Sequence, residues 1–241
     1  MPSGPIPFHS VPSLGGPWTG AGSAGEFRST VTGLLWLTVD LFLDGAAHAE
    51  RRLGELRDQL ATRDHLAVGF VVSAVMLSIR AGAFDHAESL AAACRQRGTP
   101  AGDPDAEAWY VGQLVAIRWY QGRLPELLPM LDELVSSSDR STVDNSPYAA
   151  LAVAAAQAGD RLRAAGALAT LRGRDLADLP RSSSWLVTMN GIVEAAHLLQ
   201  DTDTSARAYE LLLPFAHLPM ILSLGVASFG SVEHALGVAC T

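Results

Sequence analysis

Apolar residues recur at helical spacing along most of the chain, and the alternation of apolar and polar residues typical of β-strands is absent. Breakers interrupt this pattern at intervals of about 37 to 42 residues. After each breaker the sequence changes from an apolar helix to an amphipathic one. The breakers are Gly45, Gly82, Gly122, Gly159 and Asp201. The pattern therefore predicts an array of helical hairpins with the period of tetratricopeptide-like (TPR-like) repeats.

Two series of helices follow from these breakers. The first, apolar helices are predicted at 27–44, 65–81, 104–121, 146–158 and 182–200. The second, amphipathic helices are predicted at 46–61, 83–97, 124–137, 160–172 and 203–216. A glycine just past a helix end adopts the left-handed conformation that closes the helix. The predicted fold class is all-α, with no strand: an α-solenoid of about five antiparallel TPR-like hairpins, wound into a right-handed superhelix.

Both ends of the chain differ from this array. Residues 1–25 are rich in Pro, Gly and Ser and are predicted to form a disordered tail, so the repeat domain is assigned to 26–241. A sixth apolar helix is predicted over 220–239, with no partner helix after it and little polar covering. Either it leaves an exposed apolar patch for a partner, or the chain is a piece of a longer protein.

Composition and charge exclude several function classes. The chain has 241 residues, of which 49% are hydrophobic and 17% charged, and all 17 basic residues are arginines. Without lysine there is no P-loop lysine, no Schiff-base lysine and no Ser-Lys dyad. A formal net charge of −8, with the arginines scattered among acids, argues against a direct nucleic-acid surface.

The cysteines, the N-terminus and the apolar runs indicate the cellular compartment of the protein. Cys94 and Cys240 are the two cysteines, and they form neither a disulfide framework nor a zinc motif. The N-terminus lacks the charged and apolar regions of a secretory signal. The longest apolar stretch, 66–79, is too short to span a membrane. We therefore predict a cytoplasmic protein without a membrane partner.

No group of residues points to catalysis. The best metal candidate, Glu194-x-x-His197, places a carboxylate and an imidazole on one helical face but lacks the second pair that a di-iron site requires. There is no Gly-x-Ser-x-Gly nucleophile elbow, and Cys94 lies in an alanine run typical of a buried structural thiol. We expect no catalytic residue, no metal ion and no cofactor, and predict that the chain is not an enzyme.

A binding surface is expected on the concave face formed by the first helices, where solenoid proteins bind their partners. Trp109, Tyr110, Trp119 and Tyr120 share one predicted helix, where large rings more often fill a core than line a ligand groove. The candidate binding residues on the concave face are Trp36, Trp109, Arg118, Tyr148 and Trp185.

Four segments carry a resemblance to a known class. They are Trp109-Tyr110 with Arg118-Trp-Tyr-Gln-Gly122, then Arg181-Ser-Ser-Ser-Trp185-Leu, Ala208-Tyr-Glu-Leu-Leu-Leu-Pro-Phe-Ala216 and Phe229-Gly-Ser-Val-Glu-His-Ala-Leu-Gly237. Over about residues 30–241 the chain resembles the C-terminal tetratricopeptide-like region of large bacterial transcriptional regulators. These regulators carry a bacterial transcriptional activation domain or have an ATP-binding LuxR-type or adenylate-cyclase-type architecture.

The resemblance implies a sensing or scaffolding module whose DNA-binding and nucleotide-binding domains lie elsewhere. The function expected first is therefore protein–protein interaction. The partner would be a protein or peptide, such as regulator domains, or a second copy bound through the C-terminal apolar helix. Two alternatives stay open: a small-molecule-sensing helical domain with its ligand in the aromatic-lined groove, and a truncated fragment of a larger ATP-dependent regulator.

Overall fold

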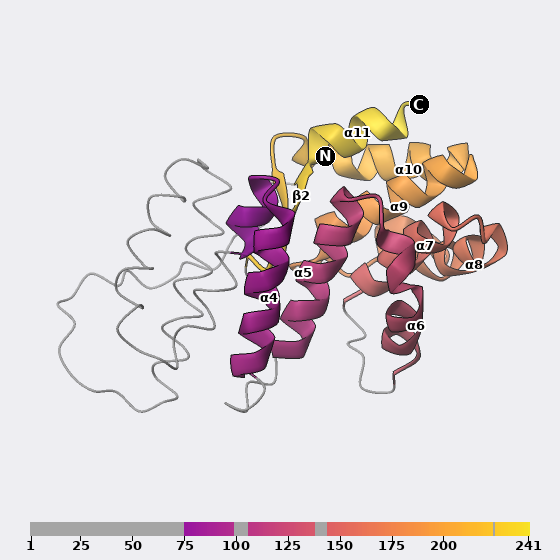
Figure 1. Ribbon diagram of the computed structural model, residues 1–241. Helices are drawn as coiled ribbons and strands as arrows, with labels where there is room; N and C mark the ends of the chain where they lie inside the picture. The colour runs from indigo at the N-terminus through magenta and orange to yellow at the C-terminus, as the bar shows by residue number, and fades with distance from the viewer. Residues whose placement is uncertain (1–74, 99–105, 138–143, 224) are drawn as a thin grey trace.

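The computed structural model describes residues 75–98, 106–137, 144–223 and 225–241 (Figure 1). The predictions for the tail, the first hairpin and most of the 65–81 helix lie outside these residues. Residues 75–80, at the end of that predicted helix, are helical. The described chain is mostly helical, which confirms the coarse prediction of a helical protein. None of its helices combines the length and the apolar character needed to cross a membrane.

The helices match the predicted ones closely. Each predicted helix between 83 and 216 is present. Those predicted at 124–137 and 203–216 include a short 3₁₀ segment (η) where a proline lies. The elements are α4 (Phe84–Gly98), α5 (Ala106–Tyr120), η2 (Leu124–Leu127), α6 (Leu128–Ser136), α7 (Ser146–Gln157), α8 (Arg161–Arg172), η3 (Leu176–Asp178), α9 (Trp185–Leu199), α10 (Thr202–Leu212) and η4 (Leu213–Phe215).

Left-handed residues close the first helices, as the breaker pattern predicted. Gly82, Gly122 and Gly159 have φ values of 72°, 68° and 82°. At the fifth breaker Gln200 takes this conformation, with φ 62°, and Asp201 accepts a hydrogen bond from the backbone N–H of Thr204 as the N-cap of α10. A short side chain with an acceptor oxygen just before the first turn pairs with one of the backbone N–H groups that have no partner within the helix. The chain therefore reverses direction at these positions.

Consecutive helices pack against one another, and α7 lies at the centre. It packs against α6, α8 and α9, while α4 packs against α5 and α9 against α10 (Figure 1). All seven residues of α7 from Ala149 to Ala155 are buried. A Cβ added at Gly191 of α9 would lie 2.7 Å from the Cβ of Ala149. Small residues therefore let α7 and α9 approach closely.

The prediction of a helix over 220–239, and of a fold without strands, is wrong. Residues Pro219–Leu222 form strand β1 and Ala227–Ser231 form β2, which pair as an antiparallel hairpin before helix α11 (Val232–Ala239). Gly225 and Gly230 adopt φ values of 85° and 92°, which a continuing α-helix does not allow. The apolar run is buried as two short strands, a pattern that periodicity alone does not separate from a buried helix.

The hairpin folds back onto the helices. Strand β1 packs against α9, strand β2 packs against α5, and α11 packs against α9 and α10 (Figure 1). Met220, Val226, Ala227 and Phe229 are buried, as are Val232 and Ala235 of α11. The apolar side chains of this C-terminal segment are therefore covered within the chain itself.

Candidate functional site

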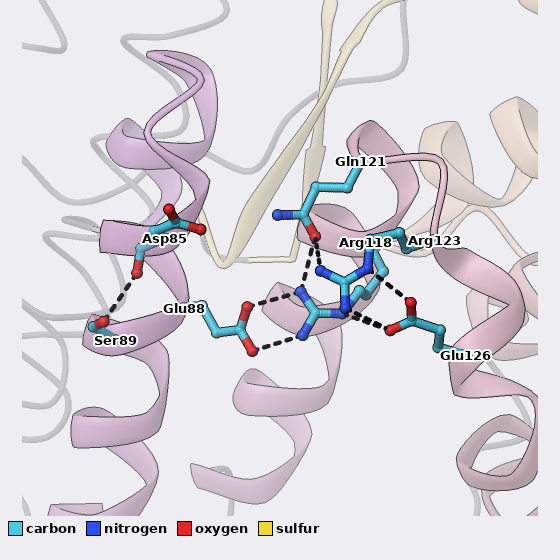
Figure 2. Close-up of polar contacts among 7 residues, drawn as sticks. All are labelled: Asp85, Glu88, Ser89, Arg118, Gln121, Arg123 and Glu126. Carbon is cyan, nitrogen blue, oxygen red and sulfur yellow. Dashed lines mark hydrogen bonds and ion pairs between the residues drawn. The ribbon is translucent and has the colours of Figure 1, made fainter.

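Arg118, one of the predicted binding residues, lies in a network of paired charges between α4 and α5 (Figure 2). Its guanidinium donates two hydrogen bonds to the Glu88 carboxylate, at 2.7 and 2.6 Å, and a third to Gln121 Oε1 at 2.9 Å. The Glu126 carboxylate lies 3.6 Å from Nε of Arg118 and accepts hydrogen bonds from Arg123. The Arg118 side chain is only 11% exposed.

The electrostatics of this network follow from its hydrogen bonds. Those from Arg118 lower the pKa of Glu88, and the same contact raises the pKa of Arg118. The pKa of Glu126 is lowered, first by its hydrogen bond from Arg123. Since each of these charges faces an opposite one, the network ties α5 to α4 and its groups are engaged within the protein.

The other predicted binding residues lie apart from this network. Trp109 and Tyr148 are half-buried and pack against the core. Trp185 is buried, with the Phe215 ring edge-on at 5.4 Å and the Arg181 guanidinium carbon 3.7 Å from its ring centroid. Trp36 lies outside the described residues. None of the four described candidates lines the cavity described next.

A cavity of about 640 Å³ lies between α5, α6, α7, the start of α9 and the hairpin. The α5 wall is a stripe of residues spaced three or four apart, which places them on one face of the helix. From the start of α5 to its end, the stripe contains Glu107, Ala108, Val111, Gly112, Val115 and Trp119. At 1.5 Å per residue this stripe is about 18 Å long.

The remaining walls are largely apolar. Leu131 and Leu134 come from α6, and Val187 comes from α9. The hairpin contributes Leu222 and Phe229, and α7 contributes Ala149 and Ala150. The Phe229 ring meets Trp119 edge-to-face, with 5.5 Å between the centroids. The end of the cavity near Trp119 is therefore aromatic and apolar.

Polar residues line the opposite end: Glu107 at the start of α5, Ser137 after α6, and Asp144 and Ser146 at the start of α7. Oδ1 of Asp144 accepts hydrogen bonds from the Ser146 N–H at 2.9 Å, the Ser146 hydroxyl at 2.8 Å and the Ser184 hydroxyl at 2.7 Å. Glu107 forms an ion pair with Arg95, at 2.6 Å. The two carboxylates are thus held by neighbouring groups, and this end of the cavity is polar.

Glu194 and His197, the metal candidate of the sequence analysis, each contact a different group in the structure. The Glu194 carboxylate lies 3.9 Å from Nε2 of His234, and Nδ1 of His197 lies 3.1 Å from the Thr241 hydroxyl. Across the described ranges, no three His, Cys, Asp or Glu side chains gather closely enough to hold a metal ion.

Sequence reasoning missed the cavity-lining residues apart from Trp119, which it assigned to the core. One signal was present: Gly112 interrupts an otherwise bulky apolar helix, which marks a close approach of another segment. A Cβ at Gly112 would lie 2.8 Å from Cδ2 of Leu222 and 3.4 Å from Cγ1 of Val226. The approaching segment is the hairpin, whose position the sequence did not reveal.

Comparison with known proteins found no matching family model, and no curated protein or solved structure with significant similarity.

Proposed function

We propose that this chain is a helical ligand-binding module that holds a small, uncharged, apolar molecule in the cavity between α5 and the hairpin. The observation that carries the proposal is the cavity of about 640 Å³, walled by apolar side chains and bounded on one side by the hairpin. Ligand sites in proteins commonly have volumes of about 300 to 1,000 Å³ and mostly apolar linings. The regular helix–breaker–helix order supports a TPR-like arrangement of the helices around it.

The charge of the lining selects the class of ligand. Glu107 and Asp144 line the cavity, whereas none of the described side chains that line it is an arginine or a histidine. A charged ligand would lose its hydration without gaining an ionic partner, because Glu107 is paired with Arg95 and Asp144 already accepts three hydrogen bonds. An uncharged molecule has no such loss and gains from burying its apolar surface against Trp119 and Phe229.

The hairpin favours a small molecule over a peptide. In a TPR-like array a peptide would bind along the first helices, here α5, α7 and α9. Strands β1 and β2 pack against α9 and α5. The chain's own hairpin therefore takes part of the surface that a peptide would use. An interaction module for a protein or peptide, related to bacterial transcriptional regulators, remains the second candidate on the basis of the sequence resemblance.

A pair of fluorescent probes tests the proposal. N-phenyl-1-naphthylamine is uncharged, and 8-anilinonaphthalene-1-sulfonate carries the same rings with a sulfonate. We expect the uncharged probe to bind with the lower Kd. At a concentration ten times its Kd it should stabilise the protein by about 1.4 kcal/mol, through mass action. Absence of saturable binding, or tighter binding of the sulfonate, would contradict the proposal.

A matched pair of variants locates the bound probe. Val111→Phe adds a ring to a half-buried position on the cavity wall, whereas Ala206→Phe adds a ring to an exposed position on α10. The first variant should weaken binding of N-phenyl-1-naphthylamine by tenfold or more because it fills the site, and the second should leave the Kd within twofold. Equal affinity of both variants would place the probe elsewhere.

A further inference from the structure

The hairpin is both a wall of the cavity and a separate structural unit. Leu222 and Phe229, one from each strand, line the cavity where the hairpin contacts α5. Along the chain, the hairpin follows η4 and precedes α11, so it extends from the C-terminal helices across to α5 (Figure 1). Whatever occupies the cavity therefore contacts the helices and the hairpin at the same time.

The hairpin depends on this docking for its order. It has two strands only, with a register irregularity between Pro219 and Ile221. A lone two-stranded hairpin is at best marginally stable in water. Its hold on α5 comes from the edge-to-face contact of Phe229 with Trp119 and from the close fit of Leu222 over Gly112. Both contacts border the cavity, so a molecule bound there extends the same apolar interface.

The hairpin is joined directly to α11. Strand β2 ends at Ser231 and α11 begins at Val232, so no linker separates them. The Ser231 hydroxyl accepts a hydrogen bond from the His234 N–H at 3.3 Å, and the Val232 N–H donates to the Leu218 carbonyl at 3.1 Å. A displacement of β2 from α5 therefore changes the position of the first turn of α11.

We propose that ligand binding is coupled to docking of this hairpin: the occupied cavity holds β1, β2 and α11 against the helices, and the empty cavity lets them open as a unit. The inference rests on the proposed function, because it takes the same cavity as the ligand site. It assigns the C-terminal segment as the part of the molecule that changes when the ligand binds.

Amide hydrogen exchange of the full chain tests this coupling. With N-phenyl-1-naphthylamine at ten times its Kd, exchange in residues 219–239 should slow by about 11-fold, because the ligand binds the docked form only. Exchange in α8, which does not line the cavity, should change by less than twofold. Unchanged exchange of the hairpin with saturating probe bound would overturn the coupling while leaving the proposed function intact.

A matched pair of aromatic truncations tests the same unit without ligand. Phe229→Ala removes the ring that contacts Trp119, and Phe215→Ala removes the ring that contacts Trp185 at a similar distance, outside the cavity. The first variant should speed exchange of residues 219–239 by tenfold or more with α8 unaffected, and should weaken probe binding tenfold. The second should leave the probe Kd within twofold.

Outcomes of the truncations separate the two proposals. Equal acceleration in α8 and in the hairpin of the Phe229→Ala variant would show that they open together, which overturns the coupling. Should that variant unfold, Leu222→Ala, a half-buried position on the same wall, takes its place. Failure of any probe to bind the unaltered protein would refute the proposed function, and it would be seen in fluorescence before exchange is measured.

Discussion

Replacing Glu88 with glutamine removes one member of the Arg118 network and retains the size of the side chain. Arg118 is 11% exposed and donates two hydrogen bonds to this carboxylate. The same two helices carry a second Arg–Glu pair, Arg95 with Glu107, whose side chains are 47% and 57% exposed. Glu107→Gln is therefore a matched control that differs from Glu88→Gln in burial.

The burial difference sets the expected magnitudes. Removing one partner of a fully buried ion pair costs about 3–5 kcal/mol. Glu88 is 37% exposed, and Arg118 keeps Gln121 as an acceptor at 2.9 Å and Glu126 as an ion-pair partner at 3.6 Å. We therefore expect Glu88→Gln to lower the free energy of unfolding by about 1–2 kcal/mol. Glu107→Gln should cost less than about 0.5 kcal/mol, as is usual for exposed pairs.

Urea denaturation measures the free energy of unfolding of both variants. We expect the midpoint of the transition to shift, while the slope of the free energy against urea concentration stays unchanged. The pKa of Glu88 is lowered from its ordinary value of 4.5, principally by the hydrogen bond from Arg118. Its contribution is therefore complete above that value and is lost as the pH falls through the folded-state pKa. The difference in the free energy of unfolding between the unaltered protein and the Glu88→Gln variant should therefore become smaller in acid. Equal costs for the two variants at pH 7, or a difference that does not change in acid, would refute the reasoning.

Two further predictions concern packing and the thiols. Gly191→Ala should lower the free energy of unfolding by about 1–3 kcal/mol, because the added Cβ would lie 2.7 Å from the Cβ of Ala149 and 3.2 Å from its carbonyl carbon. Gly166→Ala, on α8 with nothing within 4 Å, should raise it by up to about 1 kcal/mol; urea midpoints for both variants check this. Cys240 is exposed and Cys94 is buried, so a thiol reagent should modify one cysteine promptly and the other only on unfolding. Rapid modification of both would contradict the burial of the Cys94 side chain.

The helices were predictable because their ends are encoded locally. Gly122 ends the helix predicted at 104–121, and the structure has α5 at Ala106–Tyr120. The breaker at Asp201 shows that the signal is not glycine alone. There Gln200 adopts the left-handed conformation and the aspartate begins the next helix. Both features depend on a few neighbouring residues, which a single sequence contains in full.

The hairpin was not predictable because distant helices decide it. Residues 220–222 and 226–229 are short apolar runs that suit a buried helix or a buried strand equally well. What distinguishes the two is the space between α5 and α9, which the hairpin fills. The cavity has the same origin, since one of its walls is the hairpin. Trp119 was visible in the sequence, but its partner Phe229 was placed in a helix.

The packing of β2 against α5 also sets the order in which these segments can fold during synthesis on the ribosome. Leu222 contacts the surface beside Gly112, which leaves the ribosome about 110 residues earlier. Helices that contact their neighbours in sequence can pack during synthesis, whereas contacts between distant segments form late. Until Ser231 has emerged, the apolar stripe of α5 has no covering from the hairpin. During that interval the apolar residues of α5 that the hairpin later covers are exposed, which favours aggregation of the nascent chain.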